Sequence, residues 1–380
     1  MTRTTSSPTA TDVFATLLRG EAIPWSTVRM VPEEFLRASS EQDLTGLIYE
    51  RLCGRLEGCD WPEDIGEALT REARAQTARE LLRRKELISV LDVLAAEGIH
   101  PILLKGTALA YSVYDNPASR PRVDTDLLIR GNQVDAVRRV MARSGYTAPT
   151  HCDGDLLFCQ FPVKKTDEFG LVHTFDFHWK ISTQSLFADV LVFDEIADVA
   201  IAVPALGVHA RTAGPLHALL LACIHPVMHH RNAESLVWIY DVHLLASRLS
   251  GREFDRFTEL AVAKQVSAIC AHQLTAARRW LGTHIPNQAI TALGAGPARE
   301  PSTAYLRPNR QWHDELISNI RGLPRWSDRL RLLREVALPG PTYMLEAYGL
   351  AASPLGAALL PVLYLHRLAS GGWKVLTRQK

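Results

Sequence analysis

Two acidic residues, Asp124 and Asp126, lie two positions apart in an otherwise apolar segment that continues into the run 127–129. In an extended strand, side chains at i and i+2 point to the same face, about 6–7 Å apart along the strand. Two ionised carboxylates in a hydrophobic strand repel each other and lose solvation, and a divalent cation relieves both penalties. The spacing therefore predicts a metal site. An Asp-x-Asp pair on an exposed edge or in a turn is the alternative for this pattern taken alone.

The segment before this pair supplies groups that bind phosphate. The short apolar run 102–104 predicts a buried strand that enters a tight turn at Lys105-Gly106, followed by a short helix over 107–114. Arg120 and Arg122 follow in the next loop. A lysine, a glycine turn at a helix start, arginines and an Asp pair are the groups needed to hold a nucleoside triphosphate with its magnesium ions.

A third carboxylate, Asp176, lies between two phenylalanines in a segment, 171–181, that we expect to form a strand paired with a strand over 156–164. Alternation places Asp176 and His178 on one face and the aromatic residues on the other. From the residues alone, a catalytic carboxylate and an Asp on the solvent face of an antiparallel strand are about equally supported.

The sequence resembles the uncharacterised nucleotidyltransferase family of the DNA polymerase beta-like nucleotidyltransferase superfamily. The resemblance covers roughly residues 80–250 and rests on Lys105-Gly106, Arg120-Pro121, 124–129, Phe175–Trp179, the pair His225 and His229, and 236–241. The superfamily more often has Gly-Ser or Gly-Gly and a shorter gap before its Asp pair. This chain has Gly106-Thr107 and a longer insert that carries the arginines.

The resemblance implies an α+β fold, with a small mixed-sheet nucleotidyltransferase core flanked by an N-terminal helical region and a C-terminal helical domain. It implies an enzyme that moves a nucleoside monophosphate from an NTP to an acceptor hydroxyl by two-metal catalysis, with release of pyrophosphate. Asp124, Asp126 and Asp176 would be the catalytic carboxylates and would hold two Mg²⁺ ions, with Mn²⁺ as an alternative.

Other groups would bind the nucleotide or assist the reaction. Lys105, the Gly106 and Thr107 amides and Arg120 would neutralise the β- and γ-phosphates. The secondary candidates are Arg122, which could instead form an ion pair with Asp124, His178, which would assist Asp176, and the set His225, His229 and Asp241, which the family pattern places near the active cleft.

His225 and His229 stand at i and i+4, a spacing that would bind zinc if a third ligand converged. No Glu makes the pair a metallohydrolase motif, and we expect Pro226 to disturb the helix between them. Core or substrate-contacting histidines are therefore the favoured interpretation.

Two other functions remain open. The chain could be a non-catalytic nucleotide-binding or regulatory protein that retains the nucleotidyltransferase fold. It could also contact a membrane peripherally through residues 341–380. The stretch 347–365 contains no charged residue, but prolines interrupt it, which favours a helical hairpin over a membrane span.

Composition restricts partners and compartment. The 380 residues carry a formal net charge of +1, which disfavours long nucleic acid as a substrate. The expected partners are an NTP, by default ATP, and a small-molecule, peptide or protein hydroxyl. The N-terminus lacks the apolar core of a signal peptide and the cysteines form no Cys-x-x-Cys pair, so we expect a cytoplasmic protein with reduced thiols.

Along the chain we expect a disordered lead over 1–10 and an N-terminal helical region over 11–98, with its strongest helix over 63–97. The catalytic core would span 99–182, with a helix over 132–143 capped by Asn132. A helical domain would span 183–340, and an apolar helical segment 341–380. The remaining helices are predicted over 12–19, 39–53, 215–229, 233–249 and 254–281.

Overall fold

The computed structural model describes residues 9–52, 60–148, 159–296, 300–307, 312–323, 325–350 and 354–377. The chain forms two compact units. Unit 1 comprises residues 1–126 and 199–306, and unit 2 comprises residues 127–198 and 307–380. None of the helices in the described part of the chain combines the length and the apolarity that a membrane crossing requires.

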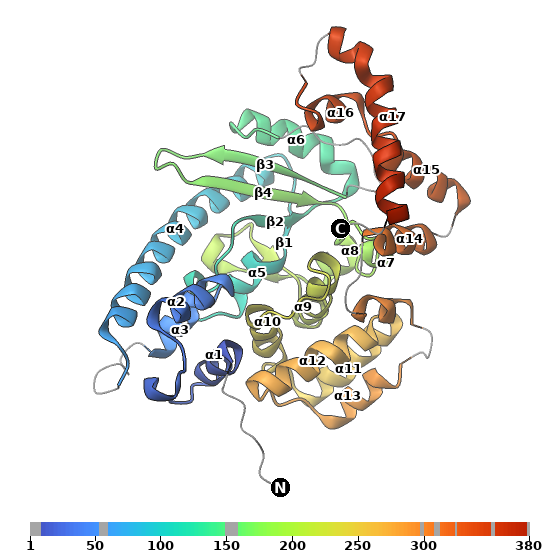
Figure 1. The fold of residues 1–380 in the computed structure, drawn as a ribbon. Helices are drawn as coiled ribbons and strands as arrows, with labels where there is room; N and C mark the ends of the chain where they lie inside the picture. Colours follow the sequence, from blue (N-terminus) through green and yellow to red (C-terminus); the bar gives the residue numbers. More distant parts are fainter. Residues whose placement is uncertain are drawn as a thin grey trace. The chain divides into compact units, whose positions relative to one another are not determined.

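Within the described residues the strands form one mixed sheet of six, in the order β3-β4-β2-β1-β6-β5. Figure 1 labels the first four strands of this sheet, β1 to β4. The strands are β1 (Ile102–Leu103), β2 (Thr125–Leu128), β3 (Gln160–Thr166), β4 (Val172–His178), β5 (Ile201–Ala202) and β6 (Arg211–Thr212). Strand β2 contains the division between the units, which falls between Asp126 and Leu127. A mixed sheet surrounded by many helices confirms the predicted α+β class.

Unit 1 surrounds its strands with helices that bury apolar side chains. The helices are α1 (Ala10–Leu18), α2 (Pro32–Glu41), α3 (Thr45–Leu52), α4 (Glu63–Ala96), α5 (Lys105–Ser112), α9 (Pro215–His229), α10 (Leu236–Ala246), α11 (Gly251–Ala263), α12 (Ser267–Leu281) and α13 (Asn287–Gly294). The predicted helices over 63–97 and 215–229 are confirmed as α4 and α9. Strand β6 runs parallel to β1, with Leu103 opposite Thr212, and neither β5 nor β6 was expected from the sequence.

Three predicted helix boundaries are wrong, each for a local reason. The helix expected over 39–53 is two helices, because Asp43 has a φ of +57° and ends α2. The helix expected over 254–281 is also two, because Gln265 has a φ of +56° between α11 and α12. A residue in the left-handed region cannot continue a right-handed helix. The cap of α1 is Thr9, and Asp12 is its partner in a capping box.

Unit 2 contains the β3–β4 hairpin and helices on both sides of it in the sequence. These helices are α6 (Val134–Arg143), α7 (Ser185–Ala188), α8 (Phe193–Asp198), α14 (Trp312–Gly322), α15 (Trp326–Ala337), α16 (Pro341–Ala347) and α17 (Pro354–Thr377). Asn132 does not cap α6, because a 3₁₀ turn, Gly131–Gln133, precedes that helix. The hairpin is confirmed, with Pro162 opposite Asp176. Strand β4 ends three residues before the predicted end at 181, and β3 continues two residues beyond the predicted end at 164. The predicted strand residues 156–158 lie outside the described ones.

The alternation predicted for β4 is confirmed. Phe175 and Phe177 are 2% and 0% exposed, whereas Asp176 on the other face is half-buried. The C-terminal prolines do not divide the last helix, because α17 begins at Pro354 and runs through Pro361. The hairpin predicted within 347–365 is therefore wrong, because residues 354–365 belong to a single helix. Helix α17 packs instead against α16, whose residues precede this stretch except for Ala347, and residues 351–353 lie outside the described ones.

Among the described residues, Cys159, Cys223 and Cys270 are buried and form no disulfide. The other three, Cys53, Cys59 and Cys152, lie outside the described residues, as do residues 1–8 of the expected disordered lead.

Candidate active site

Lys105 joins strand β1 to helix α5 in an uncommon backbone conformation. Its φ is +52°, in the left-handed region, where a non-glycine residue costs on the order of 1 kcal/mol. Hydrogen bonds hold the strand on both sides: the Leu104 N–H donates to the Asp126 carbonyl at 3.0 Å, and the Thr212 hydroxyl donates to the Leu103 carbonyl at 3.2 Å. The sheet therefore fixes the backbone from which the Lys105 side chain projects.

The Lys105 ammonium forms an ion pair with Asp126, one of the three predicted metal ligands. Its Nζ lies 2.7 Å from Asp126 Oδ1, and both side chains are largely buried. A charge-assisted hydrogen bond of this length compensates much of the cost of removing both charges from water. Lys105 thus supplies positive charge at the place where the sequence predicts a metal ion.

Asp124 lies immediately before β2 and is half-buried. Burial, and then the negative charge of Asp126, raise the pKa of the Asp124 carboxyl above its ordinary value, and Lys105 opposes this effect. The hydroxyl of Thr107 donates to the Asp124 backbone carbonyl at 3.4 Å, which ties the start of α5 to the start of β2. Added positive charge would stabilise the ionised form of Asp124.

Strand β4 supplies two further candidate ligands, Asp176 and His178. The Ile129 N–H donates to the His178 carbonyl at 2.8 Å, so the end of β2 pairs with the end of β4. Asp126, Asp176 and His178 each offer a ligand atom, and these atoms lie within 4.8 Å of one another. Two predicted ligands and one secondary candidate are therefore in this group, and Asp124 is not. Two carboxylates and an imidazole form a donor set that fits a divalent cation.

Arg120 forms a buried ion pair with Asp241. Its Nη2 lies 2.9 Å from Asp241 Oδ2, and its Nε donates to Asp241 Oδ1 at 3.0 Å. The Tyr114 hydroxyl also donates to Asp241, at 2.6 Å, and burial followed by the Asp241 charge raises the pKa of Tyr114 well above its ordinary value. A Cβ added to Gly106 would lie 3.8 Å from the guanidinium, so Arg120 covers the Gly106 backbone. Asp241 thus positions Arg120 beside the α5 start.

Arg122 is paired with a residue that the sequence did not indicate. Its Nη2 lies 2.8 Å from Oε1 of Glu80, in α4, and its Nη1 donates to the Thr125 hydroxyl at 2.5 Å. Tyr111 donates to the same Glu80 oxygen at 2.6 Å. The ion-pair partner of Arg122 is therefore Glu80 of α4, and not Asp124, which the sequence left open as an alternative.

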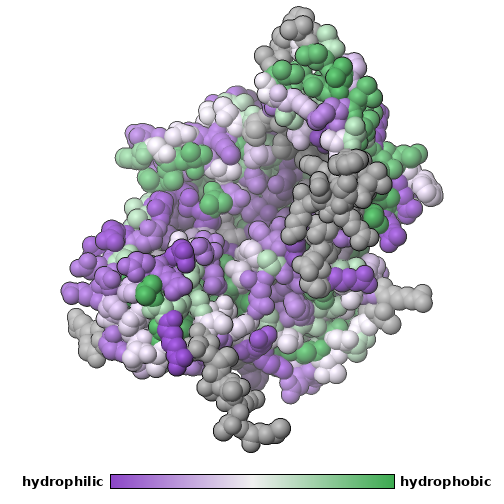
Figure 2. Space-filling model, viewed as in Figure 1, coloured by the Kyte–Doolittle hydropathy of each residue, from purple (hydrophilic) through white to green (hydrophobic). Residues whose placement is uncertain are grey.

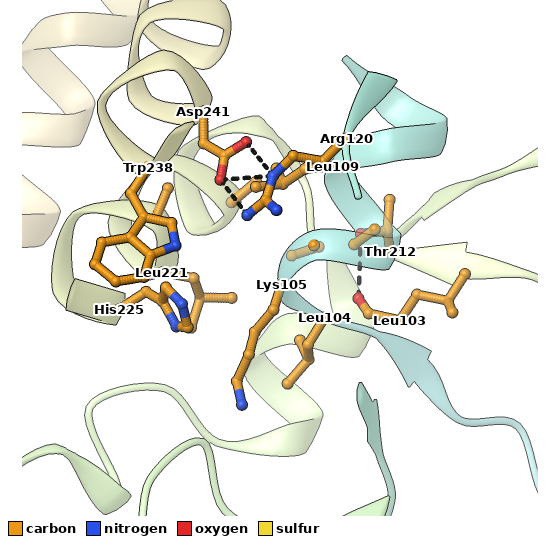
Figure 3. A pocket seen from close by; sticks show the side chains of 15 residues that line it. Leu103, Leu104, Lys105, Leu109, Arg120, Thr212, Leu221, His225, Trp238 and Asp241 are labelled. Atoms are coloured by element: carbon orange, nitrogen blue, oxygen red, sulfur yellow. Dashed lines mark hydrogen bonds and ion pairs between the residues drawn. The ribbon is translucent and has the colours of Figure 1, made fainter. Parts of the chain in front are cut away.

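A pocket in unit 1 brings together five of the predicted residues: Lys105, Gly106, Arg120, His225 and Asp241 (Figure 3). Its cavity of about 40 Å³ has room for a water molecule or an ion, and a nucleotide would extend beyond it. Most of the remaining lining is apolar, from β1, α5 and α9, and Trp238 lies beside His225 (Figure 3).

His225 and His229 do not form a zinc site with a third residue. Within the described part of the chain, Asp126, Asp176 and His178 are the one group of three or more His, Cys, Asp or Glu side chains close enough to share a metal ion. Nδ1 of His225 is buried and has no hydrogen-bond partner there, and its ring packs edge-on against Trp238, 5.8 Å between ring centroids. Burial, and then the Lys105 charge, hold the pKa of His225 well below its ordinary value, so the ring is neutral. Contrary to expectation, α9 continues through Pro226.

Sequence reasoning missed Glu80, Tyr114, Thr212 and Trp238. Glu80 and Thr212 are distant in the sequence from the motifs, and only the packing of α4 and the pairing of β6 place them near Arg122 and Leu103. Trp238 lies inside the motif 236–241, but no role was predicted for it.

Comparison with known proteins gives one family. A search of curated proteins finds no match. A family model described as "Uncharacterised nucleotidyltransferase" matches residues 30–282, which is more than half of the chain and includes β1, β2, β4 and the pocket. The chain therefore belongs to the uncharacterised nucleotidyltransferase family.

Proposed function

We propose that this protein is a metal-dependent nucleotidyltransferase that moves a nucleoside monophosphate from an NTP to an acceptor hydroxyl and releases pyrophosphate. Family membership supports the transferase class. The observation that carries the proposal is the group of Asp126, Asp176 and His178 beside the Lys105 ammonium. This group supplies the donors for a divalent cation next to a cationic helix start that suits a triphosphate.

The donor phosphates would bind at the start of α5. The first N–H groups of a helix have no partner within the helix and point toward its N-terminal end. The Gly106 and Thr107 amides are such groups, and Lys105 would exchange Asp126 for a phosphate oxygen when the cation binds. Arg120 would act mainly by holding this turn, because Asp241 occupies two of its donor positions.

The transfer step needs an acceptor oxygen to attack the α-phosphorus while the bond to the bridging oxygen breaks. Divalent cations held by Asp126, Asp176 and His178, with Asp124 beside them, would neutralise phosphate charge and lower the pKa of the acceptor hydroxyl. Asp176 would orient that hydroxyl, and Asp176 or His178 would accept its proton. The leaving pyrophosphate would carry the two phosphates that Lys105 and the α5 amides hold.

We propose ATP as the default donor with Mg²⁺ or Mn²⁺, in the cytoplasm, and a small molecule, a peptide or a protein side chain as the acceptor. The balanced charge of the whole chain, +1, offers little attraction to a long nucleic acid.

The Lys105–Asp126 ion pair favours one rival function, a non-catalytic nucleotide-binding or regulatory protein. In such a protein the ammonium would replace the metal ion permanently, and nucleotide binding would not depend on Mg²⁺.

Thermal stabilisation by each of the four ribonucleoside triphosphates, with and without Mg²⁺, separates these functions. For the transferase we expect stabilisation that requires Mg²⁺ and is lost in Asp126→Asn. Asp135→Asn, an exposed carboxylate of α6, is the matched control and should retain it. Stabilisation that is equal without Mg²⁺, or unchanged in Asp126→Asn, would favour the regulatory protein.

A further inference from the structure

Helix α15 of unit 2 exposes an apolar stripe to solvent. Trp326, Leu330 and Leu333 are 73%, 63% and 42% exposed, and they stand at i, i+4 and i+7. This spacing places them on one face of the helix. Leu332, which points elsewhere, is 1% exposed and anchors the helix to its unit. The α15 stripe is therefore the outward face of a helix whose inner face is already buried.

The charges of α15 are arranged around this stripe. At 100° per residue, Asp328 and Glu335 lie on the side of the helix opposite the α15 stripe. Glu335 also forms an ion pair with Arg331 at 3.1 Å and its side chain is only 10% exposed. Arg325 and Arg334, by contrast, are exposed, at the helix start and beside the stripe. The surface near the stripe is thus apolar and positively charged.

Helix α17 adds apolar surface in the same unit. It packs against α15 and contains no Asp or Glu. Its exposed apolar side chains include Val362 and Leu365, at 60% and 67%. In Figure 2, hydrophobic residues gather where Figure 1 draws α15 and α17.

We propose that α15 and α17 form a surface that binds an anionic lipid bilayer, with α15 lying in the plane of the interface. A tryptophan and leucines on one face, arginines beside them and acidic residues on the opposite face are the pattern of interfacial helices. The arginines would contact anionic headgroups, and the α15 stripe would enter the boundary between headgroups and acyl chains. This surface is built from residues that take no part in the proposed transfer, and its failure would leave the proposed function unaffected.

Flotation of the full-length protein with vesicles tests this proposal. We expect binding to vesicles of phosphatidylglycerol and phosphatidylcholine at low salt, and much weaker binding to phosphatidylcholine alone. Replacing Leu330 by Ser should weaken binding roughly tenfold or more, because a buried leucine contributes about 1.5–3 kcal/mol. Replacing Arg334 by Gln should weaken it about fivefold, since one arginine near an anionic surface contributes about 1 kcal/mol.

Two matched variants in unit 2 control for general effects of the substitutions. Phe169→Ser removes an exposed aromatic side chain, 68% exposed, at the hairpin turn, and Arg139→Gln removes an exposed charge from α6. Both should bind as the wild type does. Absence of wild-type binding to the anionic vesicles, or equal losses in the controls, would overturn the proposal. Self-association that is abolished by Leu330→Ser, without vesicle binding, would assign the surface to a second copy of the chain and would also overturn it.

Discussion

Lys105, Arg120 and Arg122 each have a specific carboxylate partner, and the partners define different roles. Arg120 is paired with Asp241 and Arg122 with Glu80, and both pairs are buried. Lys105 is paired with Asp126, one of the candidate metal ligands. The two arginines therefore hold the backbone of the site in place. Lys105, in contrast, would leave Asp126 and bind a phosphate oxygen when the metal ion and the nucleotide bind.

Glu80→Gln should destabilise the protein strongly. The change leaves the Arg122 charge buried without its anionic partner, and breaking such a pair costs about 3–5 kcal/mol. The measurement is the free energy of unfolding by denaturant. Glu72→Gln is the control in the same helix, because Glu72 pairs with Arg79 on the surface and should contribute less than about 1 kcal/mol. Equal effects of the two substitutions would contradict this role of Glu80 as the buried partner of Arg122.

Lys105 can be tested through its backbone as well as its charge. Both Lys105→Gly and Lys105→Ala remove the ammonium and should abolish transfer, but they differ in backbone strain. Glycine adopts the left-handed region freely, so Lys105→Gly should be more stable than Lys105→Ala by about 1 kcal/mol. Unfolding of the two variants side by side measures this difference. A more stable alanine variant would show that the positive φ of Lys105 is not maintained.

His225 should make stability depend on pH in acid. Its pKa is lowered in the native protein, so below the ordinary histidine value the unfolded chain binds a proton that the native protein does not. Native stability should fall with decreasing pH from about 6.5, by up to roughly 1.4 kcal/mol per unit.

The variant His225→Gln should lose stability less steeply than the wild type over the same pH range. His272→Gln, at an exposed position, is the control and should follow the wild-type slope. An unchanged slope in His225→Gln would mean that the ring accepts a proton in the native protein.

At the scale of elements, helix α3 lies in close contact with the 3₁₀ turn Pro117–Ser119. Arg120 directly follows this turn, so the contact helps to position Arg120. A Cβ at Gly46 would lie 2.9 Å from the Ser119 Cα, and the Ser119 hydroxyl donates to Glu50 of the same helix. The absence of a side chain at Gly46 thus allows the helix to approach the turn.

Gly46→Ala should therefore destabilise the protein by about 1–3 kcal/mol, because the backbone of the turn must move. Gly251→Ala, in α11, meets no atom within 4 Å and should be neutral or slightly stabilising. Thermal unfolding compares the two. If Gly46→Ala were as stable as Gly251→Ala, the close approach of α3 to the turn would be wrong.

The sequence predicted those elements whose signals are local. Helix α4, helix α9, the β3–β4 hairpin and the alternation around Asp176 follow from periodicity and turn residues. Asp43 and Gln265 adopt left-handed conformations that the sequence pattern does not indicate. Each of the two helices predicted across these residues is therefore two helices in the structure. Asp124, Asp126 and Asp176 were predicted as the ligands, whereas the structure groups Asp126 and Asp176 with His178, which was a secondary candidate. The partners of Arg120 and Arg122 required the tertiary structure, because Asp241 and Glu80 come from distant helices.

At the scale of the whole molecule, the site residues come from separate parts of the chain. Residues 105–126 contribute the helix start and the Asp pair, residues 176–178 the other ligands, and residues 225–241 the pocket side chains. The family match covers all three segments but ends before α13 to α17. The proposed bilayer-binding surface therefore lies in the part of the chain that the family match does not include.

A nucleotide labelled at either end of its triphosphate distinguishes nucleotidyl transfer from phosphoryl transfer. The protein is incubated with Mg²⁺, an extract of small molecules and protein, and an NTP labelled on either the α- or the γ-phosphate. We predict transfer of the α label with release of pyrophosphate, lost in Asp126→Asn and retained in Asp135→Asn. Transfer of the γ label alone, or transfer that persists in Asp126→Asn, would contradict nucleotidyl transfer at this site.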